Sequence, residues 1–236
     1  MKKLLGISAA LLGLLALTGS AHAQTISWAS AQNMVGDTDV VANGTYFDAI
    51  SFYSSALTVN GVTFNPISGG SPATDGKISV DYGDDIGAFG TPFTTTPPSS
   101  VAYSNLTDTG AFGAGGFNTV TISGLTINDI YQVQSWSYYT GDSPTATTIY
   151  SGTTPVSLLN ATGQFAIGTF TATSSSETYE YATSSGHNFV NAISVRDITS
   201  DSSVPEPSST LLLGVGFGVL VIFIRRKRQA LIQVAS

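Results

Sequence analysis

Short runs of alternating apolar and polar residues recur along the middle of the chain. Because successive side chains of a strand point to opposite faces, such alternation over roughly 4–8 residues predicts a strand with one buried face. The runs that show it are 57–64, 77–82, 118–122, 131–139, 163–172 and 188–198. No helical period extends beyond about ten residues, so the pattern predicts about ten strands and no substantial helix.

Turn signals divide these runs. Asn60 and Gly61 stand between two β-forming runs, which predicts a hairpin. The proline-containing stretch 91–100 and the glycine-rich stretch 107–116 are interpreted as loops. The fold class is therefore all-β: a single β-sandwich or jelly-roll domain over residues 24–198, long enough for one hydrophobic core.

The N-terminus has the three zones of a secretory signal peptide over residues 1–23. Lys2 and Lys3 precede an apolar run, and a small-residue cleavage site ends at Ala23, so we place the mature start at Gln24. The alternative is a retained membrane anchor, but the run is short for a span of about 20 residues.

The C-terminus carries a second membrane signal. A polar linker, 199–209, contains Pro205, Glu206 and Pro207, and an apolar segment within 210–228 ends in a basic cluster before a short tail, 229–236. The cluster consists of Arg225, Arg226, Lys227 and Arg228. The fourteen uncharged residues 211–224 give a transmembrane helix about 21 Å long, against about 30 Å of hydrocarbon. The basic cluster is expected to stay in the cytoplasm.

These three parts in this order resemble the PEP-CTERM sorting signal. The resemblance implies that an exosortase, a membrane enzyme, processes the tail as its partner during export through the inner membrane. It implies a protein of the cell envelope, cell surface or extracellular matrix.

The body also resembles the galactose-binding-like jelly rolls of exported bacterial proteins. The sequence segments that carry this resemblance are 60–64, 124–126 leading into 131–136, 168–172 and 189–197. The resemblance supports the fold more than the function, because one sandwich hosts many activities.

The charge of the chain is divided by region. Between Gln24 and Pro207 there are fifteen acidic residues and two basic ones, Lys77 and Arg196, a net charge of −13. Such an acidic body excludes nucleic acid as a partner. The absence of cysteine excludes disulfides, thiolate catalysis and cysteine-based zinc sites.

The run 131–139 holds the candidate ligand-binding residues. In a strand, one face presents an aromatic–amide set: Gln132, Gln134, Trp136 and Tyr138. A flat ring beside amides suits a polysaccharide, because sugar C–H faces stack on the ring and hydroxyls bond the amides. The alternative is that Trp136 fills the core, as aromatic residues commonly do in sandwiches.

Four carboxylates lie close together in the sequence and are a candidate calcium site. They are Asp75, Asp81, Asp84 and Asp85. Calcium takes oxygen ligands from such loops, although the spacing is not that of an EF-hand. The alternative is a solvated acidic turn; calcium, if bound, would have a structural role.

Catalytic signals are sparse. His187 is the one histidine of the mature chain and is interpreted as a turn residue, and no G-x-S-x-G motif occurs. We expect a non-catalytic exported protein whose sandwich binds or organises extracellular polysaccharide. Two alternatives stay open: a structural surface or matrix protein without a sugar site, and a glycoside hydrolase or lyase using two carboxylates.

Overall fold

The structure is a computed structural model that describes residues 25–68, 71–82, 85–88, 99–114, 118–140, 146–151, 154–183 and 186–200. Seventeen strands lie within these residues: β1 Ser27–Trp28, β2 Gln32–Asn33, β3 Thr45–Ser51, β4 Leu57–Val59, β5 Val62–Pro66, β6 Ala73–Thr74, β7 Ile78–Asp81, β8 Asp85–Ala88, β9 Thr109–Ala114, β10 Asn118–Ser123, β11 Ile130–Ser137, β12 Ala146–Tyr150, β13 Val156–Leu159, β14 Gln164–Thr171, β15 Ser176–Ala182, β16 His187–Val190 and β17 Ala192–Asp197. Helix α1 spans Val101–Asp108, and two 3-10 helices span Asp37–Asp39 and Asn160–Thr162.

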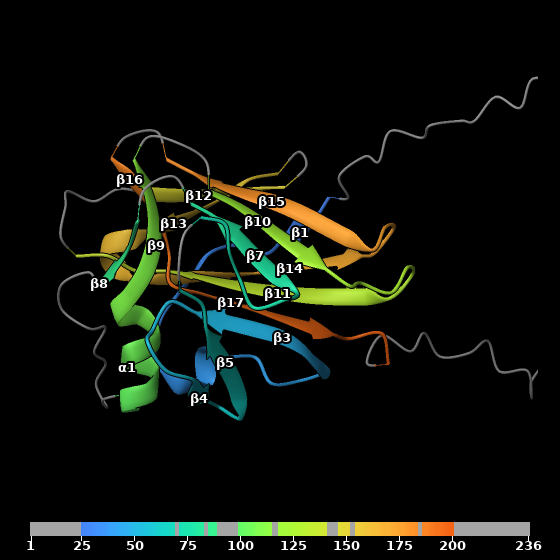
Figure 1. Cartoon of the computed structure of the whole chain (residues 1–236), viewed down its shortest axis with the longest axis horizontal. Coiled ribbons are helices and arrows are strands. Elements are labelled where there is room, and N and C mark those ends of the chain that lie inside the picture. Colours follow the sequence, from blue (N-terminus) through green and yellow to red (C-terminus); the bar gives the residue numbers. More distant parts are fainter. Residues whose placement is uncertain are drawn as a thin grey trace, which may run out of the picture.

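Two sheets form the layers of a sandwich (Figure 1). The larger sheet has the order β1-β14-β11-β17-β3-β5-β4, with β2 also paired to β14, and the smaller has the order β13-β12-β15-β10-β7-β6. A third sheet, β16-β9-β8, lies at one end. Every described strand pair is antiparallel except β3 with β5, which is parallel. The predicted all-β sandwich is confirmed.

The main core lies between the two large sheets. The smaller sheet contributes Ile78, Val80 and Val120, and the larger sheet contributes Val133 and Val195. These positions alternate with more exposed ones along β7 and β10, as the sequence pattern predicts. Alternation therefore identified which side chains enter this core.

A second core lies on the other face of the larger sheet, between α1, the central strands and the β4–β5 hairpin that ends this sheet (Figure 1). Ser100 caps α1, because its hydroxyl accepts a hydrogen bond of 3.1 Å from the Tyr103 N–H. Tyr103 and Leu106, three positions apart, share the buried face of the helix. The sequence pattern did not reveal this helix, because two turns give too few apolar positions to establish a period.

The predicted hairpin is confirmed at Asn60 and Gly61. Both residues have positive φ, 48° and 77°, and they join Val59 to its cross-strand partner Val62. Positive φ at both central positions is the type I′ turn whose twist matches that of the flanking strands.

Two sequence predictions are corrected. The interpretation of 107–116 as a loop is wrong, because Thr109–Ala114 forms β9 between β8 and β16. The run 188–198 is two strands rather than one. It breaks at Asn191, whose amide donates to the carbonyl groups of Thr107 and Thr109 at 3.0 Å each.

The signal peptide with its cleavage site at Ala23 and Gln24, and the sorting segment from Pro205 to Arg228, lie outside the described residues. Within the described part of the chain, no helix is both long and apolar enough for a membrane crossing.

Candidate functional site

Trp136, the centre of the predicted sugar-binding face, lies in the second core. Its side chain is 0% exposed. Its ring meets Phe64 edge-on, with centroids 5.7 Å apart, and Phe165 at 6.3 Å. A ring with no accessible face cannot stack on a sugar. Trp136 is therefore a core residue and not part of an exposed sugar-binding face.

Gln134 and Tyr138 are also buried. The Gln134 amide donates to the Asp39 carbonyl at 2.6 Å and accepts from the Val41 N–H at 3.1 Å, which fastens the segment 39–41 over the sheet. The alternation along β11 was predicted correctly. The error was in the exposure of this face, because distant segments cover it.

Gln132 differs from its three companions. It is half-buried, and in the register of the larger sheet it lies opposite Arg196. Its Oε1 atom is buried and has no hydrogen-bond partner among the described residues. Gln132 therefore borders the polar end of this sheet face, where Arg196 lies.

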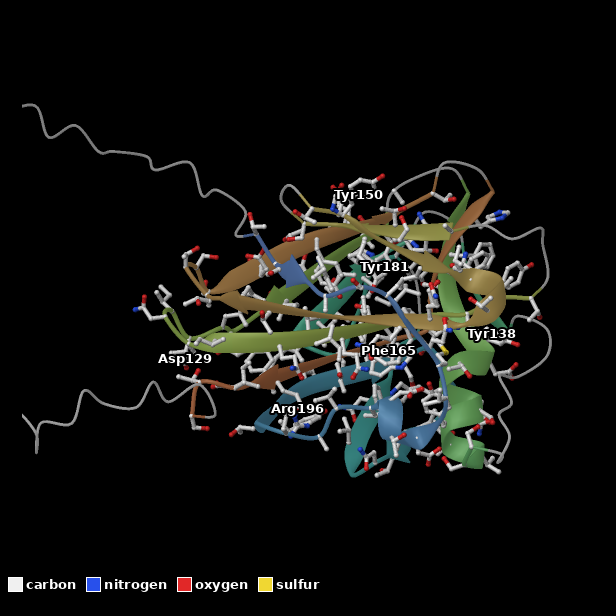
Figure 2. All side chains as sticks on the ribbon, turned by 180° about the vertical axis from the view of Figure 1, so that it is seen from behind. Asp129, Tyr138, Tyr150, Phe165, Tyr181 and Arg196 are labelled. Atoms are coloured by element: carbon white, nitrogen blue, oxygen red, sulfur yellow. The ribbon has the colours of Figure 1, made fainter. Side chains whose placement is uncertain are left out.

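A pocket of about 350 Å³ opens at this end. Its lining residues are Tyr46, Gly61, Thr63, Asn65 and Arg196. The pocket lies where β3 and β5 separate, since these strands pair only at two positions, through Asn65 and Pro66 of β5. Farther along, the Tyr46 hydroxyl donates to the Thr63 carbonyl at 3.1 Å and spans the separated strands. Figure 2 shows Arg196 at the lower edge of the molecule, between Asp129 at one end and Tyr138 toward the other.

A β-bulge aims Tyr46 into the pocket. The register of β3 with β17 shifts, so that Val195 pairs with Asp48 whereas Arg196 pairs with Tyr46. Phe47 is therefore the extra residue, and it packs against the main core while its neighbour Tyr46 faces the pocket. Bulges commonly redirect side chains in this way.

Two backbone carbonyl groups hold the guanidinium of Arg196. Its Nη2 donates to Gly44 O at 2.6 Å and its Nε donates to Asn43 O. Gly44 is required here, because φ is +75° and a Cβ atom would lie 2.6 Å from Asp197 O. Arg196 is 7% exposed, so its orientation is fixed by the protein.

Tyr46 supplies the aromatic surface of the pocket. Its side chain is 43% exposed, and its hydroxyl also accepts a hydrogen bond of 3.1 Å from the Ala49 N–H. Burial of the hydroxyl and the nearby Asp48 carboxylate raise the pKa of Tyr46, so the phenol is neutral at physiological pH. The pocket thus presents a ring, an amide and a guanidinium.

The predicted calcium ligands are only partly described. Asp75 and Asp81 are exposed, and Asp81 accepts a hydrogen bond from the Ser71 hydroxyl. Asp84 and the side chain of Asp85 lie outside the described residues. Among the residues that are described, no three carboxylate or histidine side chains are grouped to hold a metal ion, and calcium stays a prediction.

His187 begins strand β16 rather than lying in a turn, which corrects the sequence interpretation. Its ring meets Phe112 edge-on, with centroids 5.5 Å apart. It is the packing of the third sheet that positions this histidine.

Sequence reasoning missed Tyr46, Thr63 and Asn65 because a bulge and a parallel strand pair bring them together. The one available signal was Arg196, the only arginine between Gln24 and Pro207.

The family comparison concerns the C-terminal segment. A family model described as the PEP-CTERM protein-sorting motif matches residues 203–228. The chain carries a PEP-CTERM sorting motif. This motif marks an exosortase substrate, exported across the inner membrane to the cell envelope or surface. No curated protein matches the chain in sequence.

Two groups of solved structures are similar to the body. A calcium-binding mutant of Bacteroides uniformis beta-glucuronidase 2 aligns with 64% of this chain and 18% of its own at 15% identity, with a TM-score of 0.48. The CBM22-1 xylan-binding domain from Paenibacillus barcinonensis Xyn10C aligns with 68% of this chain and 99% of its own at 12% identity, with a TM-score of 0.38. The chain thus spans about a fifth of the glucuronidase. TM-scores below 0.5 say nothing about function.

Proposed function

We propose that this PEP-CTERM protein is a non-catalytic polysaccharide-binding protein of the cell envelope. The observation that carries the proposal is the pocket between β3 and β5, which combines the half-exposed Tyr46 ring with the Asn65 amide and the Arg196 guanidinium. Saccharides have apolar C–H faces that stack on rings and hydroxyls that hydrogen-bond to amides and guanidinium groups. The volume of about 350 Å³ falls in the range of small-molecule sites.

The sorting motif supports this function through location. An exosortase substrate reaches the envelope or surface, where extracellular polysaccharide is present. In this proposal the exosortase and the inner membrane are partners during export, and the polysaccharide is the partner afterwards.

The test is a glycan-binding screen with two matched tyrosine variants. The full-length mature protein in detergent is applied to immobilised glycans, and Tyr46→Ala is compared with Tyr150→Ala. Tyr46 and Tyr150 are both 43% exposed, but Tyr150 lies on the smaller sheet. We expect saturable binding to one glycan class that Tyr46→Ala weakens at least tenfold and Tyr150→Ala leaves unchanged.

Each alternative has its own outcome in this screen. Absence of binding by the folded protein supports a structural matrix protein without a sugar site. Turnover of a glycan that is abolished by one carboxylate substitution supports an enzyme. Binding that both tyrosine variants leave intact places the site elsewhere on the molecule.

A further inference from the structure

One face of β5 forms a wall of the pocket. Gly61, in the turn before this strand, lines the pocket together with Thr63 and Asn65. Val62 and Phe64, which alternate with them, are buried in the second core. Because successive side chains of a strand point to opposite faces, this pattern directs the side chains of Thr63 and Asn65 into the pocket. A Cβ atom at Gly61 would meet nothing within 4 Å, so this end of the wall is open.

Asn65 carries polar groups that the protein does not use. The residue is half-buried, and within the described part of the chain its side-chain amide takes part in no hydrogen bond. Such an amide has two N–H donors and a carbonyl acceptor. By contrast, the hydroxyl oxygens of Thr63 and Thr58 lie 3.1 Å apart and share a hydrogen bond. The Asn65 amide is therefore ready to bind a polar ligand.

Tyr46 presents a fixed ring to the same pocket. Its hydroxyl donates to the Thr63 carbonyl and accepts from the Ala49 N–H, each at 3.1 Å. The phenol has a single proton, so it cannot donate to a ligand without losing the bond to Thr63. Tyr46 is 43% exposed and held at the outer end of its ring, so an apolar surface is in place before a ligand arrives.

A free amide beside a fixed ring suits a particular pattern of sugar hydroxyls. The amide presents a donor and an acceptor side by side, so it can donate to one hydroxyl and accept from the hydroxyl on the adjacent carbon. An isolated hydroxyl satisfies only one of these groups. The other then lies against the sugar without a partner, which costs free energy.

We propose that the pocket selects polysaccharides with two free hydroxyls on adjacent ring carbons, which Asn65 binds while Tyr46 stacks on the same sugar. This inference rests on the proposed function, because it specifies the chemical class of the sugar that the pocket binds. Asn65 is then the residue that determines specificity, and Tyr46 provides affinity for the apolar face that all such sugars share.

The position of the glycosidic linkage decides whether a polysaccharide has this pair. In a glucan linked through carbon four, the hydroxyls on carbons two and three are free in every unit. In a glucan linked through carbon three, the remaining ring hydroxyls lie on carbons two and four, which are not adjacent. The two polymers have the same sugar and the same charge, so a difference in affinity between them reports the hydroxyl pattern.

The test uses three linkage-matched pairs of neutral polymers, made of glucose, mannose and xylose. Binding isotherms of the full-length mature protein in detergent are measured on each polymer in its amorphous form. For at least one sugar, we expect the polymer linked through carbon four to bind at least tenfold more tightly than the polymer linked through carbon three.

A pair of asparagine variants isolates the contact. Asn65→Leu keeps the approximate size of the side chain and removes its donors and acceptor, so we expect it to abolish the preference for adjacent hydroxyls. Asn33→Leu makes the same change at an exposed position on β2, away from β5, and we expect the preference to remain. If Asn65→Leu fails to fold by circular dichroism, Asn65→Ala replaces it.

The outcomes separate this inference from the proposed function. Equal binding of both linkages, or tighter binding of the polymer linked through carbon three, with loss of both in Tyr46→Ala, overturns the selection of adjacent hydroxyls and leaves the sugar-binding function standing. Binding of none of these polymers, nor of any glycan in the screen, overturns both. Unchanged affinity of the Asn65 variant for whichever glycan the protein binds overturns the role of Asn65.

Discussion

Two single residues show where the sequence-based prediction and the structure differ. Trp136 and Tyr46 are both aromatic residues of strands in the larger sheet, but Trp136 is 0% exposed and Tyr46 is 43% exposed. Nothing local distinguishes them, because exposure depends on which distant segments pack over each one. Tyr46 therefore replaces Trp136 as the candidate aromatic residue for ligand binding.

Truncation of these two residues is expected to lower the free energy of unfolding by different amounts. Trp136→Ala removes a fully buried ring from the second core and is expected to lower the free energy of unfolding by about 3–5 kcal/mol. Tyr46→Ala removes a half-exposed ring and is expected to cost much less, about 1 kcal/mol. Urea denaturation monitored by circular dichroism measures both. A smaller loss for Trp136→Ala than for Tyr46→Ala would contradict this assignment.

Asp48 is expected to make stability depend on pH. Its carboxyl is buried, with Asp75 and Lys77 as charged neighbours, and Oδ2 has no hydrogen-bond partner among the described residues. Burial and then Asp75 raise the pKa of Asp48 above its ordinary value of 3.8, so the folded protein keeps a proton that the unfolded chain releases. The stability from this group is complete below the unfolded pKa and is lost as pH rises through the folded pKa.

The variant Asp48→Asn removes this charge. We expect it to raise the melting temperature at pH 7, where burial in the folded protein disfavours the carboxylate that the unfolded chain carries, and to lose this advantage as the pH falls below the ordinary carboxyl pKa of 3.8. Melting temperatures of both proteins between pH 3.5 and about 7.5 measure the difference. A constant difference across this range would show that Asp48 does not titrate as its burial requires.

At the scale of elements, the sequence predicted the parts that local pattern determines. Ile78 and Val80 alternate with exposed residues, and the Asn60–Gly61 pair has the torsion angles of its turn. The pocket was not predictable in this way, because it requires the parallel pairing of β3 with β5 and a bulge against β17. Both are contacts between residues far apart in the sequence.

Helix α1 is expected to owe its stability to the sheet beneath it. An isolated helix of eight residues is unstable in water, so the contacts of Leu106 with the second core must hold it in place. Leu106→Ala is expected to lower the free energy of unfolding by about 2–5 kcal/mol. Val101→Ala, at a position 77% exposed on the same helix, is the control and is expected to change it by less than about 0.5 kcal/mol.

At the scale of the whole molecule, negative and positive charge lie in different parts of the chain. Six of the eight basic residues gather at the two ends, and residues 24–207 between them carry a net charge of −13. Like charges on a folded surface repel one another and lower its stability, and salt screens that repulsion. We expect the positive ends to direct membrane insertion and topology, and the acidic residues between them to repel polyanions.

Salt is therefore expected to stabilise the protein, and the same experiment tests the calcium prediction. Raising sodium chloride from about 10 to 500 mM shortens the screening length from about 30 Å toward a few ångströms, so the melting temperature should rise. A calcium site would add stabilisation at millimolar calcium that magnesium at equal ionic strength does not reproduce, because calcium accepts the irregular oxygen ligands that magnesium does not. Equal responses to the two ions would mean that Asp75, Asp81, Asp84 and Asp85 act only through their charge. A fall in melting temperature with sodium chloride would contradict self-repulsion as a property of this body.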